Sequence, residues 1–283
     1  MLILRPSARS AKRLRNDDDY SSVYDAIGSS ENAQFARLAR TKKVLYVEGQ
    51  DMRILARLAK VSGTPEFLSD SSVTMMKTDG FSNWTRVSTS AWVLNQFFEF
   101  DVRVASLFDR DYRSDPEIEE FVGNLKNSEV LCFVLPFKEI ENVLLVPEAI
   151  KSAVEKNAQK KLPDSWRSRI DDIYSSTIES FKEPTSIKTA SKFVEFEMSA
   201  RPKSDLPSIM DKAMHTFSTN WKNPDFRRSK VPGKEVFSNI AKAVQEEFGV
   251  TLTDARVINE LQPSDIPQAV REILISFENF FRD

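Results

Sequence analysis

A pair of aspartates stands directly after an apolar segment and can bind a metal ion. The segment VASLF, residues 104–108, runs into Asp109-Arg110-Asp111. Alternate residues of an extended chain face the same side, about 7 Å apart. Asp109 and Asp111 can therefore reach one hard cation, or one ion each of a pair about 4 Å apart. Ligation by oxygen alone selects Mg²⁺ or Mn²⁺, so the pattern indicates metal-assisted chemistry.

Further acids follow two other apolar segments. Glu48 comes directly after KVLYV, and Glu139 and Glu141 come soon after VLCFVLP. In a parallel sheet the carboxyl ends of the strands meet at one edge, where ligands bind. Acids gathered there without a cation would repel one another and have raised pKa values. The convergence of three segments therefore favours a metal site.

Each acid also has a simpler structural interpretation. An Asp-x-Asp sequence after a strand is commonly a turn or a cap. Asp51 stands where a helix would begin and can be its N-cap. Glu139 and Glu141 can be acids in a first helical turn, where they interact favourably with the helix dipole. Residue type and spacing leave these alternatives open.

The segments around these acids predict an α/β fold. Apolar segments typical of strands alternate with amphipathic segments typical of helices up to about residue 137. This alternation predicts a small, mostly parallel sheet with helices on both faces. The remainder predicts a largely helical C-terminal region. The predicted strands are 44–47, 71–80, 102–108 and 129–136, and the predicted helices before residue 137 are 30–40, 51–61, 83–100 and 114–127.

Composition excludes several classes of function. The 283 residues include one cysteine, Cys132, and one histidine, His215, so a structural zinc site or a Ser-His-Asp triad is not expected. No Gly-rich phosphate-binding loop and no apolar stretch long enough for a bilayer occurs. The formal net charge of −2 means that contact with nucleic acid would need local basic groups or bound cations. A lone cysteine favours the cytoplasm.

At these residues the sequence resembles a known family. VLYVEGQD, residues 44–51, and SLFDRD, residues 106–111, resemble the topoisomerase–primase (Toprim) catalytic fold, in which one strand ends in Glu-Gly and a later one in Asp-x-Asp. LPFKEIENVLL, residues 135–145, and VPGKEVF, residues 231–237, resemble the Toprim branch of OLD-family (overcoming lysogenization defect) nucleases. Residues 1–42 resemble the segment that joins an ABC-type ATPase domain to a Toprim domain.

The resemblance implies a domain organisation and a set of partners. The chain would be the C-terminal part of a longer ATPase–nuclease, with a lead-in over 1–42 and a Toprim-like catalytic core over 43–145. A helical region over 146–283 would complete or cover the site. The ATPase domain would act in cis or in trans, DNA would be the substrate, and a homodimer is compatible with the pattern. No membrane contact is expected.

The resemblance also assigns roles to individual residues. Glu48 would be a metal ligand and the general base, and Gly49 would allow a tight turn beside it. Lys234 would stabilise the charge that develops on the phosphate. Only one of Glu139 and Glu141 need face the metals, and the sequence leaves that choice open. The remaining proposed metal ligands are Asp51, Asp109 and Asp111, and the proposed phosphate contacts are Arg110, Arg113, Lys230 and Lys234.

The expected function is hydrolysis of DNA phosphodiester bonds with two Mg²⁺ or Mn²⁺ ions. One alternative is a catalytically silent Toprim-like module that docks or regulates the ATPase, and another is a nuclease acting on RNA. A phosphatase of the haloacid dehalogenase type also places Asp-x-Asp after a strand. It requires Thr or Val two residues after the second aspartate, where this chain has Arg113.

Overall fold

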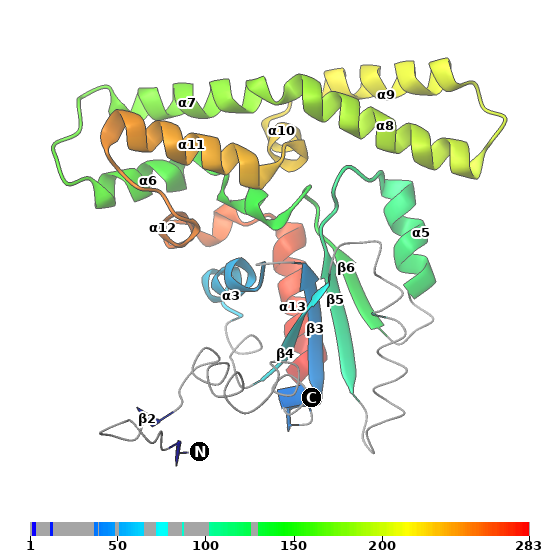
Figure 1. Ribbon diagram of the computed structural model, residues 1–283, viewed down its shortest axis with the longest axis horizontal. Helices are drawn as coiled ribbons and strands as arrows, with labels where there is room; N and C mark the ends of the chain where they lie inside the picture. Colours follow the sequence, from blue (N-terminus) through cyan, green and yellow to red (C-terminus); the bar gives the residue numbers. More distant parts are fainter. Residues whose placement is uncertain are drawn as a thin grey trace.

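The computed structural model of the protein describes residues 2–3, 12–13, 37–38, 40–48, 51–64, 72–78, 87, 102–125 and 130–282. Most of the predicted helices over 30–40 and 83–100 lies outside this part of the chain. Figure 1 shows a sheet beneath an elongated layer of helices. The fold is α/β with a helical C-terminal region, which confirms the predicted fold class.

The main sheet is four-stranded and parallel throughout, in the order β4-β3-β5-β6. Its strands are β3 (Lys43–Glu48), β4 (Thr74–Thr78), β5 (Arg103–Phe108) and β6 (Val130–Val134). Short strands β1 (Leu2–Ile3) and β2 (Lys12–Arg13) form a separate antiparallel pair. The central strands β3 and β5 are apolar because both of their faces are covered, as the sequence predicts.

Two of the helices match the predicted segments 51–61 and 114–127 to within two residues, and the region after the sheet is helical as predicted. Four short elements, η3, α10, α12 and η4, do not appear among the predictions. The elements are α3 (Asp51–Val61), α5 (Asp115–Leu125), η3 (Ile140–Leu144), α6 (Pro147–Asn157), α7 (Trp166–Ser180), α8 (Lys182–Ala200), α9 (Leu206–Asn220), α10 (Pro224–Lys230), α11 (Gly233–Phe248), α12 (Asp254–Ile258), η4 (Pro263–Asp265) and α13 (Gln268–Arg282).

Alternate residues of β3 and β5 pack into two separate apolar clusters. Leu45 and Leu107 belong to the larger cluster, which also contains buried residues of α3 and α13. Val44 and Phe108 belong to the smaller one, where the Phe108 ring meets Phe121 of α5 edge-on, with 5.4 Å between ring centroids. Helices therefore cover both faces of the sheet, and its carboxyl edge is left for the loops that carry the acids.

The last helix returns to the sheet. In α13, Phe277 packs edge-on against Phe133 of β6 at 5.2 Å between ring centroids, and the Phe280 carbonyl accepts a hydrogen bond of 2.7 Å from Arg103 Nη1. Part of the region over 146–283 thus completes the α/β core, while the proposed boundary after residue 145 stays a prediction. No helix in the described ranges is both long enough and apolar enough to cross a membrane.

Candidate active site

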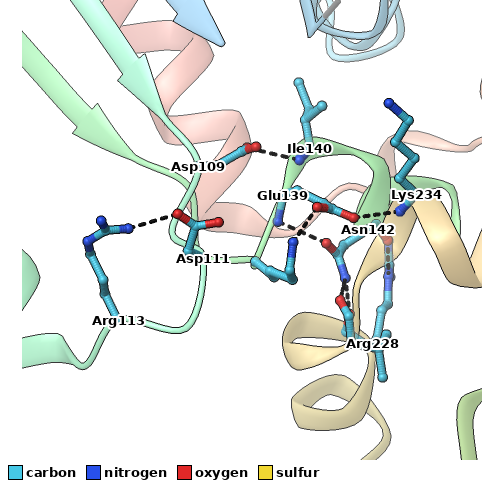
Figure 2. Close-up of polar contacts among 10 residues, drawn as sticks. Asp109, Asp111, Arg113, Glu139, Ile140, Asn142, Arg228 and Lys234 are labelled. Atoms are coloured by element: carbon cyan, nitrogen blue, oxygen red, sulfur yellow. Dashed lines mark hydrogen bonds and ion pairs between the residues drawn. The ribbon is translucent and has the colours of Figure 1, made fainter. Parts of the chain in front are cut away.

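Two loops at the carboxyl edge of the sheet, one after β5 and one after β6, are joined by hydrogen bonds (Figure 2). The Asp111 backbone N–H donates to the Lys138 carbonyl over 2.8 Å. The Ile140 N–H donates to Asp109 Oδ1 over 3.1 Å, which fixes the Asp109 carboxylate against the start of η3. The two loops that carry the acids therefore lie against each other, as the parallel topology predicts.

Glu48, at the end of β3, lies beside Asp109 and Asp111, and its carboxylate lacks a full set of hydrogen-bond partners in the described part of the chain. Its Oε1 atom is buried and has no hydrogen-bond partner among the described residues. Burial, and then the negative charge of Asp111, raise the Glu48 pKa to about 7. A hydrogen bond from the Asp109 backbone and the charges of Arg113 and Lys138 oppose that rise. The site therefore holds a buried carboxylate oxygen that a cation would satisfy.

Asp111 lies in a turn beyond the strand. β5 ends at Phe108, and Asp111 has φ of 52°, in the left-handed region that Asp tolerates better than most residues. Its Oδ2 accepts a hydrogen bond of 2.9 Å from Arg113 Nη1. The expectation that Asp109 and Asp111 alternate along an extended segment is therefore wrong in its geometry. The turn places Asp111 beside both Glu48 and Arg113 instead.

Glu139 and Glu141 differ in their surroundings. Glu139 Oε2 forms an ion pair with Lys138 Nζ at 2.5 Å, and Oε1 accepts a hydrogen bond of 2.6 Å from the Lys234 backbone N–H. The Glu141 side chain accepts no hydrogen bond from any other described residue, and burial raises its pKa. The structure thus commits Glu139 to two internal partners and leaves Glu141 the more available of the two acids.

Asn142 holds the loop with these acids in place, a role that its position in the sequence does not predict. Its side chain is fully buried; Oδ1 accepts a hydrogen bond of 3.0 Å from the Glu139 N–H, and Nδ2 donates to the carbonyls of Arg228 and Val231. Arg228 Nε in turn donates to the Asn142 carbonyl over 3.1 Å. The sequence feature that could have indicated this role is the single amide side chain in the mostly apolar segment IENVLL, residues 140–145.

Gly233 is required by the same contact. A Cβ atom placed on Gly233 would lie 2.5 Å from the Asn142 backbone nitrogen and 2.7 Å from its Oδ1. Such distances are far inside van der Waals contact, so any side chain there would displace the loop or α11. The glycine of PGKE therefore serves close packing, and it positions the next residue, Lys234, beside Glu139.

The basic residues proposed to contact phosphate lie in different environments. Arg110 forms an ion pair with Asp115, and Arg113 bonds Asp111. Lys230 is packed over the Phe226 ring, and burial, reinforced by the charge of Arg110, lowers its pKa to about 8. Within the described residues the Lys234 side chain forms no ion pair. Figure 2 shows this side chain extending away from the Glu139 carboxylate.

Two residues of the predicted site, Asp51 and Gly49, are described only in part or not at all. Asp51 is the first residue of α3, where an N-terminal helix position was anticipated, but its side chain is outside the described part of the chain. Gly49 is also outside it. Among the described residues, no three acidic, cysteine or histidine side chains are already arranged as a metal site. The donors that are present are all oxygens, and the unpaired Glu48 Oε1 fits a hard cation.

Comparisons with protein-family models, with curated proteins and with solved structures give no match to this chain. The Toprim and OLD-family resemblance therefore stays a prediction that rests on the residues quoted above.

Proposed function

We propose that this chain is a metal-dependent nuclease that hydrolyses phosphodiester bonds in DNA. The observation that carries the proposal is the environment of Glu48, whose buried Oε1 has no partner among the described residues. Its carboxylate lies close enough to Asp111 for that charge to raise its pKa. An acid that is buried beside another acid indicates a site built for a positive ligand.

Glu48, Asp109 and Asp111 are the residues that would hold the cation, with Asp51 and Glu141 as additional ligands. When bound, Mg²⁺ or Mn²⁺ lowers the pKa of a water molecule and neutralises the leaving oxygen of the phosphodiester. Lys234 would stabilise charge on the phosphate from the first turn of α11. The engagement of Glu139 by Lys138 and by the Lys234 backbone favours Glu141 over Glu139 as the extra ligand.

The proposed setting follows the resemblance. The chain would be coupled to an ABC-type ATPase in cis or in trans and would work in the cytoplasm, and a homodimer would be compatible with it. RNA remains the alternative substrate because the same chemistry cuts either backbone. The discriminating measurement is cleavage of matched DNA and RNA strands.

A second candidate, a catalytically silent module that docks on the ATPase, is favoured by one observation. Protein groups already compensate two of the acids, since Arg113 bonds Asp111 and Lys138 pairs with Glu139. In this alternative the acids would serve only to join the loops. The two candidates differ in whether the site binds metal and cuts DNA.

Cleavage of supercoiled plasmid by the purified chain, with Mg²⁺, Mn²⁺ or EDTA, tests the proposal. The variant should be Asp109→Asn, because the amide oxygen can still accept the hydrogen bond from the Ile140 N–H. Asp211→Asn, an exposed position on α9, is the matched control. We expect nicking or linearisation that needs metal, survives in the control and is lost in Asp109→Asn. If the folded protein cleaves no DNA with any of these metals, the docking module is favoured. If it cleaves RNA instead, the RNA nuclease is favoured.

A further inference from the structure

A pocket of about 500 Å³ lies beside the acidic site, and the proposed catalytic groups do not account for it. It lies between the loops after β5 and β6, the second turn of α8 and the first two turns of α11. Its lining includes Tyr112, Lys138, Lys188, Lys234, Ser238 and Asn239. The volume is within the range of about 300–1,000 Å³ found for small-molecule sites, so one nucleotide unit has room there.

Three lysines reach this pocket from three different elements. Lys138 Nζ lies 5.5 Å and Lys188 Nζ 5.9 Å from the centre of the Tyr112 ring, so one aromatic ring attracts both ammonium groups. The loop after β6 provides Lys138, α8 provides Lys188 and α11 provides Lys234. Positive charge is thus concentrated next to the carboxylates, although these residues are far apart in sequence.

The acids that line the pocket offset only part of this charge. Glu139 pairs with Lys138, and Glu235 is the second acid of the lining. Within the described residues neither Lys188 nor Lys234 forms an ion pair. The N-terminus of α11 adds the positive end of a helix dipole to the same space. An anion would therefore be attracted to the pocket and would find hydrogen-bond donors there.

We propose that this pocket binds a phosphate of the DNA strand adjacent to the bond that is cut, and that Lys188 is a principal contact. The inference deepens the proposed function and rests on it for the identity of the polymer. It makes the hairpin of α8 and α9 part of the substrate surface through Lys188. Sequence reasoning could not have found this residue, because Lys188 lies in a helix with no motif around it.

Binding in EDTA separates this proposal from catalysis. Fluorescence anisotropy of a labelled DNA duplex would be measured with the full chain, with Lys188→Gln and with Lys188→Arg. Lys242→Gln on α11 is the control, because it makes the same charge change on a side chain that is 75% exposed and does not line the pocket. Thermal melting would confirm that each variant is folded.

We expect Lys188→Gln to weaken DNA binding about five- to tenfold near 0.1 M salt and to lower the slope of log K against log salt by about 1. Lys188→Arg should retain the slope, and Lys242→Gln should stay within about twofold of wild type. Competition with inorganic phosphate and with a mononucleotide shows whether the pocket takes the free anion or requires the polymer.

Equal affinities and equal salt slopes for Lys188→Gln and Lys242→Gln would overturn the proposal, as would absence of DNA binding by the wild type. Because the assay needs no hydrolysis, the outcomes for the two proposals can be told apart. If Asp109→Asn loses cleavage while Lys188→Gln binds DNA as the wild type does, the nuclease proposal is supported and the phosphate-binding role of the pocket is rejected. If Lys188→Gln binds DNA more weakly and the wild type does not cleave, the phosphate-binding pocket is supported and the nuclease proposal is rejected.

Discussion

The carboxylate of Glu139 accepts a hydrogen bond of 2.6 Å from the backbone N–H of Lys234, although the two residues are 95 positions apart in sequence. This contact joins the loop that follows β6 to the first turn of α11. It also places the Lys234 side chain beside the acids while leaving the ammonium group without an ion pair to any described residue. Backbone and side chain of Lys234 therefore have separable roles.

Lys234→Ala removes the side chain and preserves the backbone hydrogen bond. We expect the free energy of unfolding to change by no more than about 0.5 kcal/mol, as for a surface substitution. Cleavage should fall by about 100-fold or more, as when one donor to a developing oxyanion is lost. Initial rates of plasmid nicking and urea unfolding measure the two effects. An unchanged rate would remove Lys234 from the catalytic groups.

Gly233→Ala should destabilise the protein through the contact with Asn142. The new Cβ would lie 2.5 Å from a backbone atom, so either α11 or the loop must move, at a cost of about 1–3 kcal/mol. Gly123→Ala is the matched control, because a Cβ there meets nothing within 4 Å and the residue lies inside α5. The control should be neutral or more stable by up to about 1 kcal/mol. Equal melting temperatures for both variants would refute the close approach.

Asn142→Ala should cost about 2–4 kcal/mol, because it leaves the carbonyls of Arg228 and Val231 and the N–H of Glu139 without their partner. Urea unfolding monitored by circular dichroism measures this loss. Asn124→Ala, at an exposed position of α5, should stay within about 0.5 kcal/mol of wild type. A similar small change at Asn142 would mean that the buried amide does not hold the loop.

Glu48 should make the metal-free protein less stable as pH rises. Its pKa increases from 4.5 in the unfolded chain to about 7 in the folded one, so the folded state retains a proton that the unfolded state has released. The Glu48 contribution to the free energy of unfolding is therefore greatest below pH 4.5, and it decreases as the pH rises from 4.5 to about 7. Because the carboxyl is still partly solvated, we expect a loss of about 1–2 kcal/mol.

Thermal melting in EDTA between pH 5 and pH 8 measures this loss in the wild type and in Glu48→Gln. Burial also raises the pKa values of Glu117 and Glu141, so the difference between the two proteins isolates Glu48. The variant should show the shallower decline. Added Mg²⁺ should stabilise the wild type more at pH 8 than at pH 5, since a protonated carboxyl is a poor ligand. Parallel curves of melting temperature against pH for wild type and variant would contradict the raised pKa of buried Glu48.

The sequence predicts the sheet because its strands are apolar segments that parallel packing buries on both faces. It also predicts that Glu48 lies beside Asp109, because parallel strands place their carboxyl ends together. It cannot predict the turn at Asp111, since local φ depends on the contacts with Lys138 and Arg113. Asn142, Arg228 and Lys188 act through contacts over 75 residues or more along the chain, which no local spacing records.

The proposed function depends on a cation site formed by Glu48, Asp109 and Asp111. Titration of the purified chain with Mn²⁺, with free Mn²⁺ followed by electron paramagnetic resonance, tests it without any substrate. We expect saturable binding at pH 7.5 by wild type and by Asp211→Asn, and at least about a tenfold weaker affinity in folded Asp109→Asn, because a carboxylate ligand is lost. Equal Mn²⁺ affinity in Asp109→Asn, or no binding by the wild type, would contradict it.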